Sequence, residues 1–319
     1  MRAMVIAATG GPDCFTLADV PIPTKLNSEV LVKVMAAGVN PIDAKTRAGG
    51  GVSAGITSFP AILGCDFSGV VVESPYDAYP LKPGDEVFGM VPVPRMSGCY
   101  AEYVTVPTLS VVRKPTRLSH LEAAGVPLAA LTAWGAVVDV AKAHEGQRIL
   151  IHAGAGGVGH FAVQFAAYFG AHVIATGSPS NLRWLRDLGA AEVIDRTSTR
   201  FDAVLSGVDV VIDLVGNVKD STGTRSLAVL RPGGLLVNVP SGSWPTLAED
   251  AAAAGIRATT YKVAPDGGTL AIIGRLLESG DVRITVDQVF DLTSVADAHT
   301  AIESGHTRGK IVLDLGGPL

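Results

Sequence analysis

The sequence predicts an α/β protein in which a doubly wound parallel sheet is inserted into an irregular β domain. Three observations predict it: short strand patterns fill residues 1–122, strands and helices alternate over 123–263, and short strands return in 264–319. Alternating strands and helices are typical of a parallel sheet that is covered on both faces. We therefore expect one domain from residues 1–122 together with 264–319, and a second domain from 123–263.

The composition is that of a globular protein. The 319 residues suit about two domains, and 48% hydrophobic against 17% charged residues allow a large core. The net charge is −5 and the basic residues are scattered, which argues against nucleic-acid binding. The most apolar stretch, residues 149–176, is broken by glycines and histidines. We interpret it as strand, turn, helix and strand, and not as a membrane span.

The cysteines and the first residues predict a location. Cys14, Cys65 and Cys99 are odd in number and widely spaced, which argues against a disulfide framework. Met1–Ala8 has the pattern of a strand and lacks the apolar core and cleavage site of a signal peptide. We therefore expect a cytoplasmic protein.

The first domain is marked by short runs of apolar and β-branched residues between Pro and Gly. The expected strands are Met1–Ala7, Val30–Ala37, Gly69–Glu73, Tyr100–Val106, Val286–Leu292 and Lys310–Leu315, and a helix is expected at 266–279. Gly49–Gly55 is expected to be a mobile loop, with a tight structural turn as the alternative.

In the second domain the apolar period changes to that of helices separated by strands. The expected helices are Leu121–Ala143, 158–169, 180–188 and 220–230, and the expected strands are 149–153, 172–176, 191–194, 208–213, 235–239 and Ile256–Val263.

A glycine-rich turn follows the first strand of this second domain. Gly154, Gly156 and Gly159, with Gly157 and Val158 between them, fit the pattern G-x-G-x-x-G between an apolar strand and an apolar helix. We expect Gly154 to permit the tight turn, Gly156 to let a pyrophosphate approach, and Gly159 to let helix and strand pack closely. The free N–H groups of the helix start would face the phosphates. This predicts a nicotinamide dinucleotide site; the alternative is an ordinary glycine-rich turn.

The end of the next strand predicts which dinucleotide binds. Proteins that bind NAD usually place an Asp or Glu there, on the ribose 2′-hydroxyl. Here the strand ends at Thr176 and no carboxylate follows at that point. Hydroxyl, amide and guanidinium groups stand there instead, and they suit a 2′-phosphate. These groups belong to Ser178, Ser180, Asn181 and Arg183, with Arg196 after the following strand. We predict NADPH over NADH; the alternative for the two arginines is a solvated surface.

Several short motifs along the chain together resemble one family. They are Ala36–Asp43, Gly64–Val70, Pro83–Gly89, Tyr100–Val104, Leu131–Trp134, Ala153–Gly159, Val211–Gly216, Arg231–Gly234 and Arg308–Lys310. In this order and spacing the chain resembles the zinc-independent quinone oxidoreductase (zeta-crystallin-like) group of the medium-chain dehydrogenases/reductases. The resemblance implies a GroES-like domain wrapped around a Rossmann domain, with catalysis in the cleft between them.

The same resemblance predicts a site without zinc. Zinc-using relatives carry a Cys where this chain has Asn40, and a His-Glu pair where it has Cys65 and Asp66. Their cysteine-rich lobe is replaced here by Met90–Ser97, which holds no cysteine. A catalytic zinc needs three protein ligands, so we expect no metal. We expect His152, beside the glycine turn, to be packed and not metal-bound.

The resemblance also places substrate-facing groups on the segment from Asn40 to Lys45. Asn40 could donate to a carbonyl or contact the nicotinamide ribose, and Asp43 could orient a partner. Lys45 could stabilise an oxyanion, or supply a proton if burial lowers its pKa. The alternatives are a turn-forming Asn40, a helix-capping Asp43, and a Lys45 that is solvated or paired with Asp43.

Further coenzyme contacts are expected at the domain junction and at strand ends. The resemblance implies that Thr132 contacts the nicotinamide amide; the alternative is a hydroxyl that bonds its own helix. Val215, Gly216 and Val239 end two parallel strands, at the edge where ligands of such sheets lie; the alternative there is simple turns.

These features predict an NADPH-dependent, zinc-free enzyme, which passes a hydride to a quinone or to the β-carbon of an α,β-unsaturated carbonyl. One alternative is a stand-alone enoyl reductase of a biosynthetic pathway, with Arg47 and Arg95 as a basic patch for an acyl carrier. Another is a non-catalytic NADPH-binding protein. A homodimer is expected through the sheet edge at Ile256–Val263, and the small-molecule substrate is the only other partner expected.

Overall fold

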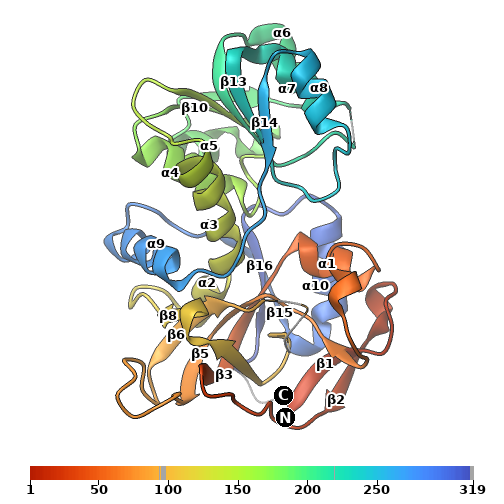
Figure 1. Cartoon of the computed structure of the whole chain (residues 1–319), viewed down its shortest axis with the longest axis vertical. Helices are drawn as coiled ribbons and strands as arrows, with labels where there is room; N and C mark the ends of the chain where they lie inside the picture. Colours follow the sequence, from red (N-terminus) through yellow and green to blue (C-terminus); the bar gives the residue numbers. More distant parts are fainter. Residues whose placement is uncertain (93, 95–97, 219, 317–319) are drawn as a thin grey trace. The chain divides into compact units, whose positions relative to one another are not determined.

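A computed structural model of the chain describes residues 1–92, 94, 98–218 and 220–316. The chain divides into two compact units, one formed by Met1–Leu131 with Ala264–Leu319 and the other by Thr132–Val263. The first boundary lies later than residue 122, because the helix α3 (Pro127–Trp134) begins within the first unit. Figure 1 shows each unit coloured along the sequence.

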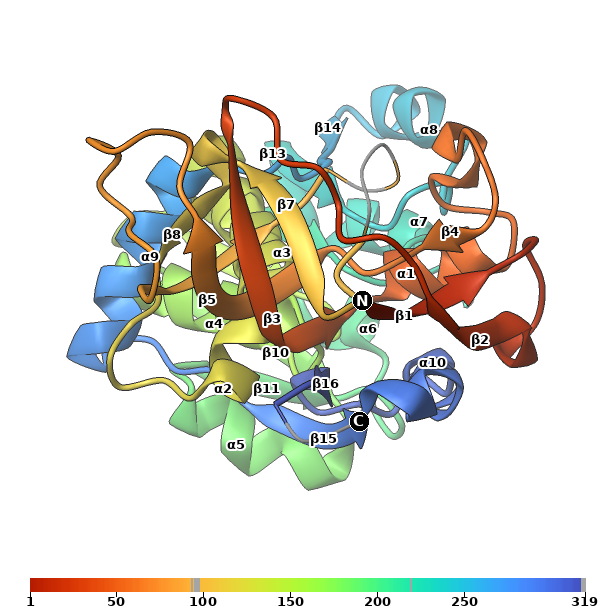
Figure 2. The same ribbon diagram turned by 90° about the horizontal axis from the view of Figure 1, so that it is seen from below.

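The first unit is built mainly on antiparallel strands. Its described strands are β1 (Arg2–Ile6), β2 (Phe15–Asp19), β3 (Glu29–Val39), β4 (Ala61–Ile62), β5 (Asp66–Glu73), β6 (Glu86–Met90), β7 (Tyr103–Pro107), β8 (Val111–Arg113), β15 (Val286–Asp291) and β16 (Lys310–Asp314). A small sheet has the order β2-β1-β4, and a larger one the order β15-β16-β3-β5-β6-β8 with β7 also paired to β3. Among the described residues, β15 and β16 are the one parallel pair of this unit. Figure 2 shows β7 beside β3. The strand β16 thus returns the end of the chain to this unit, as the sequence predicts.

The helices of the first unit are short except near its end. They are α1 (Pro41–Arg47), α2 (His120–Ala124), α3, which continues into the second unit, α9 (Gly267–Ser279) and α10 (Val295–Glu303). The expected single helix over Leu121–Ala143 is wrong. Pro127 cannot donate to the preceding turn, so α2 ends and α3 begins there, and a π-helical segment, Gly135–Val140, follows.

The segment Gly49–Gly55 is not an open loop. The Gly50 N–H donates to the Lys45 carbonyl (2.8 Å), and the Val52 N–H donates to the Thr46 hydroxyl (3.3 Å). Gly49 and Gly51 both have positive φ, 87° and 55°. The segment therefore forms a hydrogen-bonded turn after α1, which was the alternative expectation.

The second unit is a parallel sheet with helices between its strands. The strands are β9 (Arg148–Ile151), β10 (His172–Gly177), β11 (Glu192–Asp195), β12 (Val208–Asp213), β13 (Leu230–Asn238) and β14 (Arg257–Thr260). The helices are α4 (Gly159–Tyr168), α5 (Leu182–Asp187), α6 (Phe201–Val204), α7 (Thr222–Val229) and α8 (Leu247–Ala253). Within the described residues the order is β11-β10-β9-β12-β13-β14, and every pair is parallel. The predicted doubly wound sheet is confirmed.

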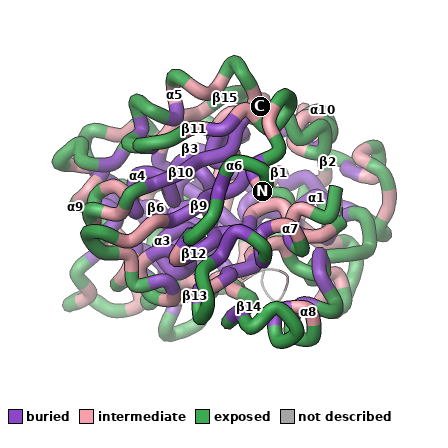
Figure 3. Tube along the Cα trace, turned by 90° about the horizontal axis from the view of Figure 1, so that it is seen from above, coloured by how far each residue is buried: buried purple, intermediate pink, exposed green. Residues whose placement is uncertain are grey.

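Burial explains why the sequence predicts this sheet so well. The central strands β9, β10 and β12 are buried along most of their length, as Figure 3 shows. A strand covered on both faces is apolar throughout, and the runs at 149–151 and 210–212 have that pattern. Among the described residues, no helix combines the length and the apolar character that a membrane crossing needs.

Candidate functional site

The glycine turn joins β9 to α4, and one of its expected roles changes. The residue with left-handed backbone is Ala153, at φ 49°, and not Gly154. A Cβ on Gly154 would lie 3.1 Å from the side chains of Ala175 and Leu185. Gly154 is therefore needed for close packing against β10 and α5, while Ala153 makes the sharp bend.

Gly159 is tightly packed and Gly156 is open, which fits the roles that the sequence predicts for them. A Cβ on Gly159 would lie 2.2 Å from the Ala153 carbonyl oxygen, so the helix start packs directly on the turn. A Cβ on Gly156 would meet one atom of its surroundings, at 3.4 Å, so this side of the turn is open. The N–H groups of Gly157 and Val158 have no acceptor among the described residues. The turn therefore presents free donors at the start of α4, which suits a pyrophosphate.

A group of polar residues follows β10, and we call it the polar ledge: Ser178, Ser180, Asn181, Arg183 and Arg196. Asn181 Nδ2 donates to Ser178 Oγ (3.0 Å), and the hydroxyls of Ser178 and Ser180 are 3.2 Å apart. The Arg196 N–H donates to the Gly177 carbonyl (3.0 Å), which places Arg196 next to the end of β10. The guanidinium groups of Arg183 and Arg196 are exposed and bond to no described residue. Two exposed arginines therefore lie near these hydroxyls, Arg183 on the helix that follows them and Arg196 beside the end of β10.

One carboxylate at this edge was missed by sequence reasoning. Asp195 pairs with Gly177 across β10 and β11, so it lies near the ledge. Its carboxylate accepts from the N–H and hydroxyl of Thr197 (2.8 and 2.7 Å) and from the Ser198 hydroxyl (2.7 Å). These bonds lower the pKa of Asp195 and turn the carboxylate into its own loop.

The ends of β12 and β13 lie at the same edge as the glycine turn, because parallel strands end together. Asp213 Oδ1 accepts from the N–H groups of Val215 and Gly216, both at 2.9 Å, and the Asp213 carbonyl accepts from Val239 (3.0 Å). Gly216 has φ 82°, and a Cβ there would lie 2.3 Å from the Ser243 side chain. The structure thus brings Val215, Gly216 and Val239 to the predicted edge.

Thr176, Thr132 and His152 are all buried. Thr176 Oγ1 accepts from the Ala153 N–H (3.2 Å), so this side chain fixes the turn from behind. Thr132 lies on α3 at the start of the second unit. His152 contacts the hydroxyls of Thr176 (3.3 Å) and Ser226 (2.9 Å), and burial lowers its pKa to about 3. His152 is packed, as expected.

In the first unit, Asn40 and Asp43 form the start of α1. The Asn40 N–H donates to Asp43 Oδ2 (2.9 Å), and Asn40 is the N-cap residue of the helix. The capping role of Asp43 is therefore present. Lys45 lies on the same helix with its side chain exposed, whereas Asn40 and Asp43 are each 1% exposed.

The lysine that meets Asn40 is Lys310, which sequence reasoning quoted in a motif but did not place in the site. Lys310 Nζ is buried and donates to Asn40 Oδ1 and to the Val39 carbonyl (3.0 Å). Asn40 Nδ2 donates to Asp66 Oδ2 (2.9 Å), and Asp66 Oδ1 accepts from the Leu128 N–H (2.9 Å). Because an ammonium can only donate, Lys310 fixes which end of the Asn40 amide is oxygen.

Asp43 extends this network. Its Oδ1 accepts from Cys65 Sγ (3.2 Å), and its Oδ2 accepts from the Tyr100 hydroxyl (3.3 Å), which also contacts His299 Nε2 (3.2 Å). Burial raises the pKa of Asp43 to about 6 and that of Asp66 to about 7. Burial also lowers the pKa of Lys310. We call Asn40, Asp43, Asp66 and Lys310 the charged cluster.

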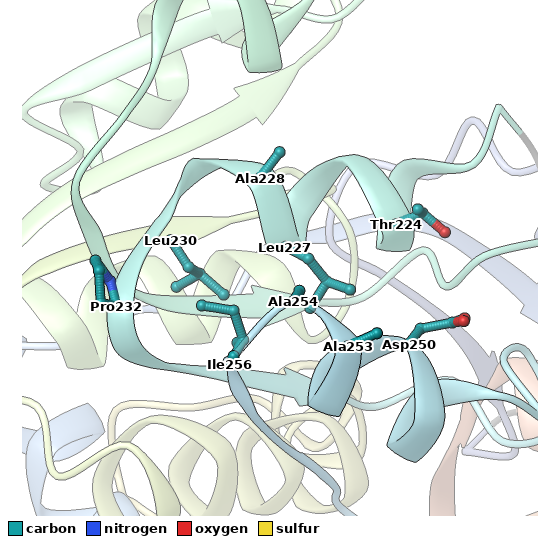
Figure 4. Close-up of a pocket in the computed structure, with 10 residues that line it drawn as sticks. Thr224, Leu227, Ala228, Leu230, Pro232, Asp250, Ala253, Ala254 and Ile256 are labelled. Atoms are coloured by element: carbon teal, nitrogen blue, oxygen red, sulfur yellow. The ribbon is translucent and has the colours of Figure 1, made fainter.

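A cavity of about 650 Å³ lies in the second unit, lined mainly by apolar residues of α7, α8 and the chain segments that follow these two helices (Figure 4). Leu230 and Pro232 begin β13, and Ile256 directly precedes β14. These are the amino ends of parallel strands, whereas the glycine turn follows the carboxyl end of β9. The cavity is therefore separate from the predicted coenzyme edge.

Comparison with known proteins agrees with this geometry. Residues 27–116 match the family model of the alcohol dehydrogenase GroES-like domain, and 188–313 match that of the zinc-binding dehydrogenases. The "NAD(P)H oxidoreductase RTN4IP1, mitochondrial" of Danio rerio is 34% identical, over 90% of this chain and 84% of its own length. The "NADPH-dependent alkenal/one oxidoreductase, chloroplastic" of Arabidopsis thaliana is 33% identical, over 98% and 79%. The solved quinone oxidoreductase of Coxiella burnetii is 37% identical, covers 99% of each chain, and has a TM-score of 0.93.

The chain belongs to the medium-chain dehydrogenases/reductases, in their quinone oxidoreductase group. The resemblance seen in the sequence is thereby confirmed, and with it the GroES-like and Rossmann domains and the class of oxidoreductases.

One matching family model is named for zinc, and the residues of this medium-chain enzyme do not fit that metal. The described residues contain no group of three or more His, Cys, Asp or Glu side chains that could hold a metal ion. In the charged cluster, the Lys310 ammonium stands where it would repel a cation, and N–H, S–H and O–H donors occupy the carboxylates of Asp43 and Asp66. Zinc-free chemistry stays a prediction.

The basic patch considered for an acyl carrier does not form around Arg47. This side chain is buried, donates to the Gly10 carbonyl (2.9 Å) and pairs with Glu303. Its guanidinium bonds within the first unit, so Arg47 forms no basic patch on the surface. Arg95 lies outside the described residues.

Proposed function

We propose that the chain is an NADPH-dependent reductase, which transfers a hydride to a quinone or to the β-carbon of an α,β-unsaturated carbonyl. One observation carries the proposal: an open glycine turn lies beside a ledge of two serines and two unpaired arginines, and a neighbouring carboxylate, Asp195, bonds to its own loop. The hydroxyl, amide and guanidinium groups of the ledge can donate hydrogen bonds to a 2′-phosphate dianion. Recognition of a 2′-hydroxyl would instead need a hydrogen-bond acceptor such as a carboxylate. The relative from Arabidopsis is named for the same coenzyme.

The second unit supplies the coenzyme contacts. We assign the pyrophosphate to the free N–H groups of Gly157 and Val158, approached over the open side of Gly156. We assign the 2′-phosphate to Ser178, Ser180, Asn181, Arg183 and Arg196. Val215, Gly216 and Val239 would border the nicotinamide half, and Thr132 would contact its amide.

The first unit supplies the carbonyl contact in this proposal. NADPH, when bound, supplies the hydride. Asn40 Nδ2 carries two hydrogens and gives one to Asp66, which leaves one for a substrate carbonyl. A donor whose direction is fixed in advance stabilises a developing oxyanion without reorganisation. Lys45 or solvent would return the proton.

Oxidation of NADPH, followed by its absorbance, tests the proposal. The substrate panel holds quinones, alkenals, enones and one enoyl thioester, each with NADPH and with NADH. We expect turnover with a quinone or an enone, and a lower KM for NADPH than for NADH. Turnover confined to the enoyl thioester would favour a stand-alone enoyl reductase. Tight binding of NADPH without turnover of any substrate would favour a non-catalytic protein. Equal affinity for both coenzymes would overturn the NADPH assignment.

Removal of one arginine sharpens the coenzyme assignment. Arg183→Ala should raise the KM for NADPH about tenfold or more, the weight of one charge-assisted hydrogen bond, and leave the KM for NADH unchanged. Arg186→Ala is the matched control, because Arg186 is also an exposed arginine of α5. Equal effects of Arg183→Ala on both coenzymes would remove Arg183 from the 2′-phosphate site.

We also propose a cytoplasmic homodimer. The strand β14 is the last of the six-stranded sheet and pairs only with β13 among the described residues. An edge of this kind invites pairing with a second copy, and sedimentation of the purified protein would measure the dimer. The two relatives above carry mitochondrial and chloroplastic in their names, so imaging of the tagged chain is needed for its location.

A further inference from the structure

His152 lies directly before the glycine turn, and its two ring nitrogens meet two hydroxyl groups. Nδ1 is 3.3 Å from Thr176 Oγ1, and Nε2 is 2.9 Å from Ser226 Oγ. The ring is 2% exposed and packs edge-on against the Phe201 ring, with centroids 4.6 Å apart. The side chain thus connects β9, β10 and α7 inside the second unit.

Counting donors and acceptors fixes the direction of each bond. The Ser226 hydroxyl donates to the Thr222 carbonyl (2.7 Å), so its single hydrogen is used. Ser226 Oγ must then accept from His152 Nε2–H. A neutral imidazole that carries its hydrogen on Nε2 accepts at Nδ1, so the Thr176 hydroxyl donates to Nδ1. Thr176 Oγ1 in turn accepts from the Ala153 N–H (3.2 Å).

We propose that His152 is a positioning residue of the coenzyme site: held as the neutral Nε2–H tautomer, it orients the Thr176 hydroxyl so that its oxygen accepts from the N–H of Ala153. Ala153 is the left-handed residue that bends the glycine turn. The chain of bonds therefore runs from the turn through Thr176, His152 and Ser226 to the first turn of α7. We call these three side chains the neutral relay.

The Nδ1–H tautomer of His152 would satisfy fewer of these hydrogen bonds. If Nδ1 carried the hydrogen, it would donate to Thr176 Oγ1, which already accepts from Ala153. The Thr176 hydroxyl hydrogen would then lose its acceptor, and Ser226 would have to leave the Thr222 carbonyl to serve Nε2. A charged ring is also disfavoured, because burial and the nearby Arg225 guanidinium both lower the pKa of His152. The Nε2–H form alone satisfies every donor and acceptor named here.

The tautomer can be measured directly. Long-range proton–nitrogen NMR spectra of protein labelled with ¹⁵N-histidine, with His152→Gln to assign the signal, distinguish the two nitrogens. We expect the Nε2–H pattern for His152, unchanged between pH 6 and 8. The Nδ1–H pattern, or a signal that titrates in this range, would overturn the proposal. This measurement needs no coenzyme.

The positioning role is tested by binding. Thr176→Val keeps the shape of the side chain and removes the hydroxyl, and Thr176→Ser restores it. Because Ala153 then lacks its acceptor, we expect Thr176→Val to weaken NADPH affinity about tenfold, the weight of one buried hydrogen bond. The turnover number at saturating NADPH should stay within about twofold, and Thr176→Ser should recover most of the affinity.

The binding experiment has a matched control in a second histidine, which lies on the same strand as Thr176. His172→Gln removes an exposed histidine at the other end of β10 and should leave NADPH affinity unchanged. Thr176→Val with wild-type affinity, or with a loss that Thr176→Ser does not recover, would contradict the positioning role. The role rests on the proposed coenzyme function, so NADPH affinity of the wild-type protein is measured first by fluorescence. Failure there rejects the proposed function, whereas the NMR experiment still decides the tautomer.

Discussion

The charged cluster of the first unit and the neutral relay of the second unit do similar work by different means. Each is a buried polar network beside a segment of the proposed site. The charged cluster surrounds Asn40 with a lysine and two aspartates. The neutral relay holds Ala153 through two hydroxyls and one imidazole.

The difference lies in what each network loses when one member is removed. In the charged cluster, one ammonium faces two carboxylates, so removal of the ammonium leaves both carboxylates without a countercharge in a buried place. In the neutral relay, every hydroxyl both donates and accepts, and one ring proton sets the direction of the whole chain. The stability of the charged cluster should therefore depend strongly on changes of charge. The neutral relay should depend on which nitrogen of His152 carries the proton.

The largest expected effect is on the charged cluster. Lys310→Met keeps most of the length of the side chain and removes the ammonium, which leaves Asp66 and Asp43 without a buried countercharge. We expect a loss of about 3–5 kcal/mol in the free energy of unfolding, as when one partner of a buried ion pair is removed. Urea denaturation at pH 7 measures it. A loss below about 1 kcal/mol would mean that the cluster is not held by charge.

The next effect compares two glycines of the coenzyme turn. Gly159→Ala places a methyl group 2.2 Å from the Ala153 carbonyl oxygen, so we expect a loss of about 2–3 kcal/mol from overpacking. Gly156→Ala meets its nearest described neighbour at 3.4 Å. It should leave the urea midpoint nearly unchanged and raise the KM for NADPH, because the added methyl group blocks the pyrophosphate. Equal stability of the two variants would show that Gly159 is not a packing glycine.

A fall in pH should change the contributions of the two networks to folding stability in opposite directions. An unfolded histidine binds a proton near pH 6.5, whereas the pKa of folded His152 is about 3. The unfolded state binds more protons in this window, so the contribution of His152 to stability is lost as the pH falls below 6.5. The pKa values of Asp43 and Asp66 are raised to about 6 and 7. Their folded forms bind more protons between about pH 4 and 7, so acid favours folding there.

Two substitutions separate these signs. Between pH 7 and 5, His152→Gln should lose less stability than the wild type, by about 2 kcal/mol. Asp66→Asn removes a group that acid stabilises, so it should lose more stability than the wild type over the same range. Urea midpoints at the two pH values measure both. Shifts of the same sign would contradict the contrast between the networks.

The parts of this molecule that the sequence predicted are those with a local signal. The strand-to-helix alternation and the glycine spacing set the doubly wound sheet and the coenzyme turn, because each depends on neighbouring residues. Lys310 was missed as a site residue because it meets Asn40 only through the pairing of β16 with β3, far along the chain. Ala153 was missed as the bending residue because glycine is the usual choice for positive φ.

Two further features escaped sequence reasoning, the first for a tertiary cause and the second for a local one. The helix α10 carries His299 to Tyr100, and the sequence pattern gave no sign of that contact. The expected helix over Leu121–Ala143 overlooked Pro127, which divides it into α2 and α3. Sequence reasoning was weakest where a residue acts through a distant partner, and both buried networks are of that kind.

The smallest effect on stability is expected at Lys45, and it completes the comparison with Lys310. Lys45→Met changes an exposed side chain of α1, so the free energy of unfolding should change by less than about 0.5 kcal/mol. Turnover with the best substrate of the panel then decides its role. A drop in kcat with an unchanged KM for NADPH would keep Lys45 as the proton donor. With kcat also unchanged, solvent is the remaining proton source, and Lys310 is the lysine that serves this site, through its hold on the amide of Asn40.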